Sequence, residues 1–248
     1  MIVIPMAGLS KRFADAGYKK SKYMLIVGGQ SVFAHVMKSF EAYFASEYFL
    51  FICRDEPGTI SFVADECRRL NIENGRLVTL KEPTRGQAET VALGLEQAEV
   101  GLGLPITIFN IDTIRPHFRF PPSDVFAGLD GYMEVFKGQG DHWSFALTKS
   151  QDDMSVLQTA EKKRISDLCS TGLYDFRRAG DFLSAYEEES KKPKEELQGQ
   201  ELYIAPLYNH LILRGRKILA VEIPPEHMIP CGTPDDFESF KQKIEKTS

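Results

Sequence analysis

A glycine-containing loop near the start of the chain is the first place where residue types and spacing point to chemistry. Ala7-Gly8-Leu9-Ser10-Lys11-Arg12-Phe13 directly follows a short apolar run. A glycine at the end of a strand lets the backbone approach a ligand, and the N–H groups of such a loop bind phosphate. The loop is neither a Walker A motif nor a dinucleotide fingerprint, which need more glycines, and an ordinary turn is the alternative. Cations that suit a polyphosphate accompany it: Arg12, Lys19, Lys20 and Lys22.

An aspartate at the end of a buried strand is the second candidate. Asp112 closely follows the apolar run PITIFN at 105–110. Open α/β sheets bind ligands at the carboxyl ends of their strands. Mg²⁺ is bound by one or two carboxylates together with substrate phosphate oxygens. Asp112 is therefore a candidate magnesium ligand, with a helix cap or a turn as the alternative.

Two polar segments add further candidates. The turn Pro83-Thr84-Arg85-Gly86-Gln87-Ala88 stands at a predicted helix start, where it can form an anion-binding or base-binding edge. Glu161-Lys162-Lys163 precedes Gly172-Leu173-Tyr174 by a few residues. These segments indicate additional polar contacts around the same site.

Strand and helix patterns alternate through the first half of the chain. Apolar, β-branched runs predict buried strands at 1–6, 48–53, 76–80 and 105–110. Apolar residues at helical spacing predict helices at 32–40, where Ser31 is the expected N-cap, and at 60–70 and 88–98. This alternation is typical of a parallel sheet with right-handed crossovers.

The second half is more mixed. It predicts strands at 130–136, 143–148 and 172–176 and a helix at 179–189. The charged stretch 187–200, broken by Pro193, predicts a solvated loop or mobile flap. Neither a repeat nor a long linker divides the sequence, so we expect one domain.

Composition excludes several classes of protein. The 248 residues carry 30 Lys and Arg against 35 Asp and Glu, a net charge of −5, which disfavours a nonspecific nucleic-acid binder. Apolar runs stay shorter than the ~18 residues of a membrane span, and the first residues lack the charge of a signal peptide. The cysteines stand singly, so we expect reduced, mostly buried thiols and no zinc site. A cytoplasmic globular enzyme or binding protein remains, without nucleic-acid or membrane partners.

Taken in order, the motifs resemble the sugar nucleotidyltransferase (nucleotide-sugar pyrophosphorylase) superfamily. The order is a glycine loop ending in Arg-Phe, a lysine before Val-Gly-Gly, Gly-Gln-Ala at a helix start, a strand-ending Asp, Glu-Lys, Gly-Leu-Tyr and Gly-Thr-Pro. The likeness is strongest to short bacterial members associated with capsule and lipopolysaccharide synthesis. It implies a nucleotidyltransferase domain over residues 1–240, followed by a C-terminal tail at 241–248. The implied fold is a single α/β domain with a Rossmann-like, mainly parallel mixed sheet flanked by helices.

The resemblance also implies a reaction. A phosphate oxygen of a phosphorylated small molecule, such as a sugar-1-phosphate, would attack the α-phosphorus of a nucleoside triphosphate and release pyrophosphate, with Mg²⁺ as cofactor. Arg12 corresponds to the arginine that neutralises the leaving phosphates, and Lys22 to the lysine that stabilises charge on the α-phosphate. Asp112 corresponds to the magnesium-binding aspartate. A pyrimidine nucleotide is favoured because Gln87 could bond to a pyrimidine edge, and a homo-oligomer is compatible with the family.

Binding roles follow from the same resemblance. The remaining matched residues are Met6, Ala7, Gly8 and Leu9 along the nucleotide, Gly86, Gln87 and Ala88 at base and ribose, and Lys162 and Gly172 at the second substrate.

The chain departs from the family pattern at three places. Ser10 replaces the second glycine of the loop, and Ser21 and Tyr23 replace the prolines around Lys22. Pro230 stands where many members carry a second metal-binding aspartate. Glu201 or a water could replace that ligand, whereas Asp235 and Asp236 are interpreted as first-turn helix acids that favour the positive end of the dipole.

Two other classes of function remain open. A glycosyltransferase of similar architecture would use a finished nucleotide sugar, but such enzymes usually carry two acids where this chain has Asn110-Ile111-Asp112. A noncatalytic nucleotide-binding homologue would account for the missing second acid. Release of pyrophosphate from a free nucleoside triphosphate separates both from the expected enzyme.

Overall fold

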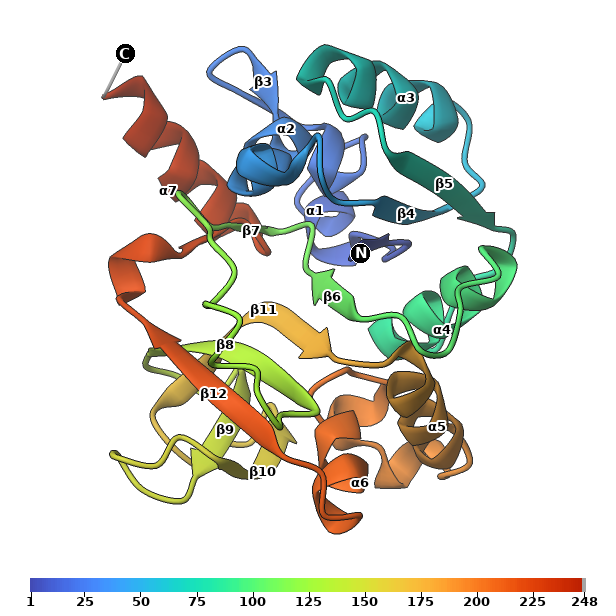
Figure 1. Ribbon diagram of the computed structural model, residues 1–248. Helices are drawn as coiled ribbons and strands as arrows, with labels where there is room; N and C mark the ends of the chain where they lie inside the picture. Colours follow the sequence, from blue (N-terminus) through green and yellow to red (C-terminus); the bar gives the residue numbers. More distant parts are fainter. Residues whose placement is uncertain (247–248) are drawn as a thin grey trace.

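A nine-stranded mixed sheet forms the centre of the computed structural model, which describes residues 1–246 (Figure 1). Its main path runs β10-β9-β11-β6-β1-β4-β5, and β8 and β12 continue from β11. The strands are β1 (Ile2–Met6), β4 (Phe49–Arg54), β5 (Gly75–Leu80), β6 (Ile106–Phe109), β8 (Gly131–Lys137), β9 (Ser144–Thr148), β10 (Val156–Glu161), β11 (Leu168–Phe176) and β12 (Ile218–Ile223).

The sheet is parallel in the half that holds the N-terminal strands. β1 pairs in parallel with β4 and β6, and β4 with β5, as the alternation of strands and helices predicts. β11 runs antiparallel to β6 and to β8, whereas β12 runs parallel to β8. The α/β class and the mainly parallel mixed sheet are therefore confirmed.

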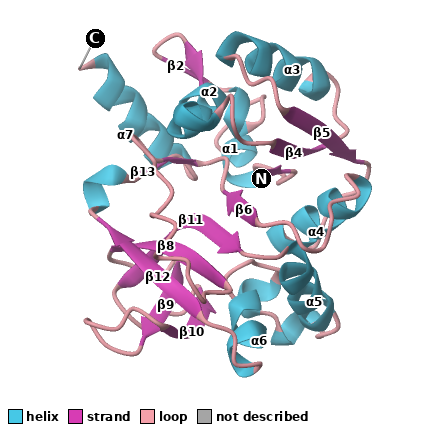
Figure 2. Cartoon of the chain, in the orientation of Figure 1, coloured by secondary structure: helices cyan, strands magenta, loops and turns pink. Residues whose placement is uncertain are grey.

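Helices cover both faces of the sheet (Figure 2). Their bounds are α1 (Lys11–Asp15), α2 (Val32–Met37), α3 (Thr59–Leu70), α4 (Gln87–Gln97), α5 (Ala179–Ser190), α6 (Leu207–Leu213) and α7 (Pro234–Glu245). Short 3₁₀ turns and two-residue strands join them: η1 (Lys22–Met24), η2 (Lys38–Tyr43), η3 (Lys194–Glu196), η4 (Gln198–Gln200), η5 (Pro225–His227), β2 (Ile26–Val27), β3 (Gln30–Ser31), β7 (Thr113–Ile114) and β13 (Ile229–Pro230).

The two-residue period of the strands divides the core into two layers. Ile2 and Ile4 of β1 pack in one apolar cluster with residues of α2 and α7. Val3 lies in the other cluster, with residues of α4, α5 and α6. Successive strand side chains point to opposite faces, so a strand covered on both sides must be apolar at every position. This explains the unbroken apolar run at the start of the sequence.

Hydrogen bonds at helix starts fix where two helices begin. Ser31 Oγ accepts from the Ala34 N–H at 3.0 Å, which confirms the predicted N-cap of α2. α7 begins with a capping box, in which Thr233 and Asp236 each accept from the other's backbone N–H. α7 then continues past residue 240 to Glu245, over most of the expected tail, whose residues 247–248 lie outside the described part of the chain.

Several elements differ from the sequence-based expectation. β10, β12, the five-residue α1 and the seven-residue α6 were not predicted, and β11 begins four residues before the expected strand. The charged stretch is not a simple loop, because α5 runs to Ser190 and the turns η3 and η4 follow. None of the helices in residues 1–246 has the length and apolar composition to cross a membrane. All four cysteines are free thiols, and three of them are buried.

Candidate active site

A cleft of about 640 Å³ opens at the carboxyl ends of β1 and β6. Four parts of the chain that are distant in sequence supply most of its lining: the loop after β1, the turn before α4, the end of β6 and the segment 192–203. Carboxyl ends of parallel strands lie at one edge of a sheet, so their loops converge there. The convergence brings most of the predicted site residues to one place.

The loop after β1 forms one wall of the cleft. Met6, Ala7, Gly8 and Leu9 line it, and Leu9 is 45% exposed. Ser10 adopts a left-handed conformation with φ of 49°, which turns the chain into α1. The Lys22 N–H donates to Ser10 Oγ at 3.4 Å and joins the loop to the lysine segment. The serine that replaces a family glycine thus holds the turn in place.

Lys22 and Asp112 meet in the cleft. Lys22 Nζ lies 2.5 Å from Asp112 Oδ2, and the two side chains are 21% and 25% exposed. Asp112 follows β6, and its carbonyl oxygen accepts from the Cys231 N–H at 2.7 Å. Lys22 and Asp112, two candidates from the sequence that lie 90 positions apart, are therefore in direct contact. No cluster of three or more His, Cys, Asp or Glu side chains arranged for a metal occurs within residues 1–246.

A glycine shapes the turn before α4. Gly86 has φ of 149°, and a β-carbon there would lie 2.5 Å from the Leu202 carbonyl oxygen. The Ala88 N–H donates to that oxygen at 2.8 Å, and the Leu202 N–H donates to the Arg85 carbonyl at 2.9 Å. Such close backbone approach requires glycine. The turn is thereby bound to the segment that closes the opposite wall.

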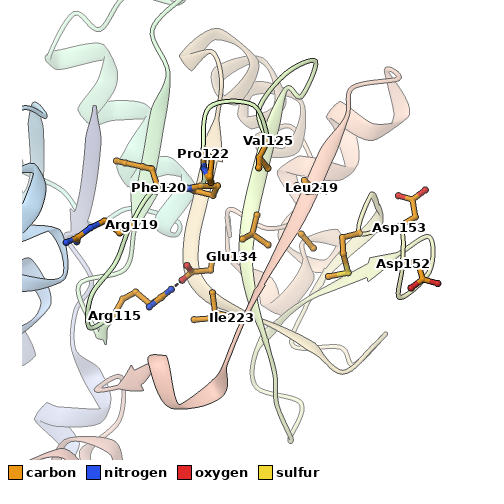
Figure 3. A pocket seen from close by; sticks show the side chains of 14 residues that line it. Arg115, Arg119, Phe120, Pro122, Val125, Glu134, Asp152, Asp153, Leu219 and Ile223 are labelled. Carbon is orange, nitrogen blue, oxygen red and sulfur yellow. Dashed lines mark hydrogen bonds and ion pairs between the residues drawn. The ribbon is translucent and has the colours of Figure 1, made fainter.

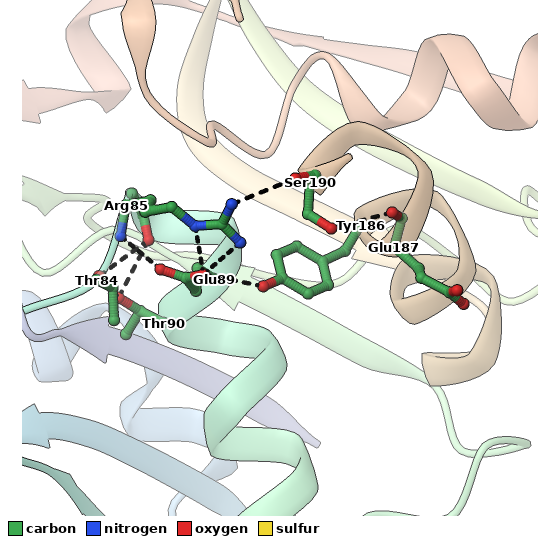
Figure 4. Close-up of polar contacts among 8 residues, drawn as sticks. Thr84, Arg85, Glu89, Thr90, Tyr186, Glu187 and Ser190 are labelled. Atoms are coloured by element: carbon green, nitrogen blue, oxygen red, sulfur yellow. Dashed lines mark hydrogen bonds and ion pairs between the residues drawn. The ribbon is translucent and has the colours of Figure 1, made fainter. Parts of the chain in front are cut away.

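Arg85 strengthens the same connection through its side chain (Figure 4). Its guanidinium contacts the Glu89 carboxylate at 2.6–2.7 Å and donates to the Ser190 carbonyl at 3.2 Å. Tyr186 also donates to Glu89, at 3.2 Å. Partial burial acts to raise the pKa of Glu89, but the bonds from Arg85 leave it below its ordinary value. Arg85 thus ties the turn to the end of α5.

Gln87 and Asn110 form the floor of the cleft. Gln87 Nε2 donates to Asn110 Oδ1 at 2.5 Å, and both residues line the cleft. The Asn110 N–H donates to the Gly172 carbonyl at 3.1 Å. Gly172 has φ of 89°, and a β-carbon there would lie 2.6 Å from Asn110 Nδ2. Gly172 is therefore required beside the floor of the cleft, because any side chain there would collide with Asn110.

Lys162 lies at the margin of the cleft. Its Nζ donates to the Tyr203 hydroxyl and lies 4.5 Å from the centre of the Tyr203 ring. The adjacent Glu161 is buried, accepts from Ser144 Oγ and binds Gln198 Oε1 through its backbone N–H at 2.7 Å. Burial raises the pKa of Glu161 to about 6. Lys162, Tyr203 and the adjacent buried Glu161 form a polar corner at the margin of the cleft.

Some predicted residues do not line the cleft itself, although the charge of Arg12 acts on Tyr203, which does. Arg12 is exposed on α1 and does not line the cleft, although Lys11 does. Ala88 is buried beneath the turn. Glu201 lines the cleft on the Tyr203 side, where burial and the carboxylates of Glu201 and Glu161 raise the pKa of Tyr203. Glu201 therefore lines the same cleft as Asp112, on the side of Tyr203.

The structure adds lining residues that the sequence reasoning missed. They include Asn110, Tyr203, Lys192 and Lys194. Asn110 could have been found by its place at the end of a predicted strand, two residues before Asp112. The two lysines belong to a stretch whose charge was interpreted as solvated, and no local signal places them at the cleft.

A second hollow, of about 750 Å³, lies along β12 and the segment 115–125 (Figure 3). The ion pair of Arg115 and Glu134, 2.9 Å long and 9% and 4% exposed, stands at its edge. Burial raises the pKa of Glu134 despite the bonds from Arg115. None of the predicted site residues lines this hollow, whereas most of them line the first cleft.

Together these features define an α/β protein whose ligand cleft lies at the carboxyl edge of a largely parallel sheet. The crystal structure of the nucleoside-diphosphate-sugar pyrophosphorylase from Vibrio cholerae RC9 superposes on this protein with a TM-score of 0.92. The two sequences are 50% identical, and the match covers 98% of this chain and 100% of the Vibrio chain. The chain therefore belongs to the nucleoside-diphosphate-sugar pyrophosphorylases of the sugar nucleotidyltransferase superfamily, and it is a nucleotidyltransferase.

More distant structures share the fold. A UDP-glucose pyrophosphorylase complexed with UDP-glucose is 16% identical, with a TM-score of 0.75, over all of this chain and 98% of that one. The inositol-1-phosphate CTP transferase of T. maritima is 13% identical, with a TM-score of 0.73, over 98% of this chain and 95% of that one. Neither a family model nor a curated protein sequence matches the chain.

Proposed function

We propose that this nucleotidyltransferase joins a pyrimidine nucleoside triphosphate to a sugar-1-phosphate or a similar phosphorylated small molecule and releases pyrophosphate. The observation that carries the proposal is the contact between Lys22 and Asp112 at 2.5 Å inside the cleft that the glycine loop also lines. A cation and a carboxylate at the strand ends suit two anionic substrates that must be brought together, one of them with a divalent metal.

In the proposed reaction, an oxygen of the acceptor phosphate forms a bond to the α-phosphorus. The bond from that phosphorus to the bridging oxygen of the β-phosphate breaks, and pyrophosphate leaves with the electron pair. The protein contributes position and charge, because phosphoryl and nucleotidyl transfers need little covalent chemistry from side chains. Lys22 stabilises charge at the α-phosphate, and Lys11 and Arg12 stand on the side where the leaving phosphates are expected.

The remaining residues orient the substrates. The backbone of Met6–Leu9 follows the nucleotide, and Gly86, Gln87 and Ala88 form the base and ribose side. Lys162 and Gly172 bound the second substrate, together with the polar corner of Glu161, Glu201 and Tyr203. Lys162 is held by Tyr203 and is therefore already directed towards that corner.

Magnesium is the cofactor we propose, and the donor set fits it. Asp112 offers a partly exposed carboxylate at the strand end, and Lys22 Nζ lies against it where a positive charge is favoured. Mg²⁺ prefers oxygen ligands and keeps several waters or phosphate oxygens. When bound, it would neutralise phosphate charge and polarise the α-phosphate. Glu201 does not serve as the second ligand in this proposal, since its contacts are at the acceptor corner.

The preference for a pyrimidine has two supports. Gln87 presents an amide at the expected base side, and two structures with this fold are described with UDP-glucose or as a CTP transferase. A role in surface polysaccharide synthesis rests on the resemblance to short bacterial capsule and lipopolysaccharide members. It implies work in the cytoplasm, where nucleoside triphosphates are available.

One assay tests the reaction. The four nucleoside triphosphates and dTTP are each combined with a set of sugar-1-phosphates and other phosphorylated small molecules, with Mg²⁺, and pyrophosphate release is measured. A pyrimidine nucleotide with one acceptor class is expected to give the highest kcat/KM. Turnover of a finished nucleotide sugar instead would identify a glycosyltransferase. Tight nucleotide binding without any turnover would identify a noncatalytic homologue.

A further inference from the structure

The C-terminal segment returns to the carboxylate of the cleft. β13 pairs antiparallel with β7, so that Pro230 lies opposite Thr113, the residue after Asp112. The Cys231 N–H then donates to the Asp112 carbonyl at 2.7 Å. Pro230 stands at the position where the family resemblance implies a second metal-binding aspartate, and proline has no carboxylate. The residues that follow it in the chain nevertheless lie against Asp112.

Gly232 leaves a small space that two carboxylates border. A β-carbon on Gly232 would lie 3.2 Å from Asp112 Oδ2 and 4.0 Å from Asp236 Oδ2. The carboxylates of Asp112 and Asp236 therefore border the same small space beside Gly232.

The first turn of α7 fixes Asp236 in this position. Asp236 Oδ2 accepts from the Thr233 N–H at 2.9 Å, and Thr233 Oγ1 accepts from the Asp236 N–H at 3.1 Å. Asp236 is half-buried, whereas the preceding Asp235 is exposed. A carboxylate has about four lone-pair sites, so the capping bond leaves Asp236 able to bind a cation.

We propose that Asp236 supplies the second carboxylate of the divalent cation site at Asp112, in place of the acid that Pro230 removes. The proposal rests on the proposed function. Two features of the site fit a cation: the Asp112 carboxylate is partly exposed, and the absence of a side chain at Gly232 keeps the space between the carboxylates open. The capping box would thus hold a metal ligand as well as start a helix.

The test is the affinity for Mn²⁺, measured by the loss of the free-ion electron paramagnetic resonance signal, without and with a nucleoside triphosphate. Asp236→Asn keeps an oxygen that accepts from Thr233 but removes the charge. Asp235→Asn is the matched control, because it removes an equal charge from the same helix turn on its exposed side. We expect Asp236→Asn to raise the Mn²⁺ dissociation constant at least ~10-fold and Asp235→Asn to change it less than ~2-fold.

A second variant keeps both charges. Gly232→Ala places a methyl group 3.2 Å from Asp112 Oδ2 and is expected to weaken Mn²⁺ binding as well. Circular dichroism and the urea midpoint without metal establish that each variant is folded, and if Asp236→Asn unfolds, Gly232→Ala provides the test. Equal Mn²⁺ affinity for the Asp236, Asp235 and wild-type proteins would overturn the assignment.

The proposed function can fail separately. If Asp236→Asn binds Mn²⁺ normally while the wild type still releases pyrophosphate, only the role of Asp236 is wrong. If the wild type gives no pyrophosphate with any substrate pair but binds Mn²⁺ through Asp236, the metal site stands and the reaction is wrong.

Discussion

Replacing Lys22 by methionine is expected to abolish turnover with little effect on stability. Lys22 and Asp112 are each about a quarter exposed at an ion-pair distance of 2.5 Å. Water therefore screens the pair, which contributes about 0–1 kcal/mol to the free energy of unfolding. Loss of one positioned charge at a developing anion costs about 10²–10³ in rate, or about 2.7–4 kcal/mol in activation free energy.

A matched variant in the buried ion pair should behave in the opposite way. Arg115 and Glu134 are 9% and 4% exposed and lie away from the predicted site residues. Arg115→Met leaves the Glu134 carboxylate buried without its partner, which typically costs about 3–5 kcal/mol of stability. The folded fraction should keep its rate of pyrophosphate release.

Urea unfolding at pH 7 and initial rates of pyrophosphate release measure the two quantities on the same preparations. The reasoning is refuted if Lys22→Met releases pyrophosphate at a near-normal rate. It is also refuted if this variant loses several kcal/mol of stability, because the pair would then serve the fold. Asp112→Ala should match Lys22→Met in both measurements.

Three further predictions follow from the walls of the cleft. Gly86→Ala forces a β-carbon to 2.5 Å from the Leu202 carbonyl oxygen, so it should lower the free energy of unfolding by about 1–3 kcal/mol in urea titrations and raise KM for the nucleoside triphosphate. The folded state binds the Glu161 proton more tightly than the unfolded chain, because burial raises the pKa from 4.5 to about 6. The raised pKa of Glu161 therefore adds about 2 kcal/mol to the free energy of unfolding below pH 4.5, and this contribution is lost as the pH rises through 6. Glu161→Gln should remove that part of the pH dependence. Arg85→Ala should change stability by less than about 1 kcal/mol but speed limited proteolysis at 191–200, since the bond to Ser190 is lost; an unchanged cleavage rate would contradict this role.

Local patterns were sufficient for the elements that build the nucleotide side of the fold. β1 is apolar at every position and β4 at every position before Arg54, because helices cover both faces of the sheet, and such runs are visible in the sequence. β10 was missed because its sequence Val-Leu-Gln-Thr-Ala-Glu includes polar residues. Two of them, Thr159 and Glu161, are buried in the structure, where hydrogen bonds satisfy their side chains. α6 was missed because it is only seven residues long. Burial of polar groups depends on partners that no local pattern shows.

The candidate site likewise contains some residues that the sequence alone singles out and others that only tertiary contacts bring into place. Residue types and their order in the chain were sufficient to single out the glycine loop and Asp112, because each follows an apolar strand, and Gln87, because it stands at a helix start. Lys22 was singled out as one of several cations near the glycine loop and by the resemblance to the family. The same resemblance marked Pro230 as a position where many members carry an acid.

Only the tertiary structure decided which side chains meet. The pairing of β13 with β7 and the capping box of α7 bring Asp236 to the space beside Gly232, and Glu201 lines the cleft on the side of Tyr203. Lys192 and Lys194, which belong to a charged stretch, reach the cleft because α5 and the turn at Arg85 anchor that stretch there. The physical reason is that such contacts join residues far apart in the chain, and their distances are set by strand pairing and helix caps rather than by local residue type.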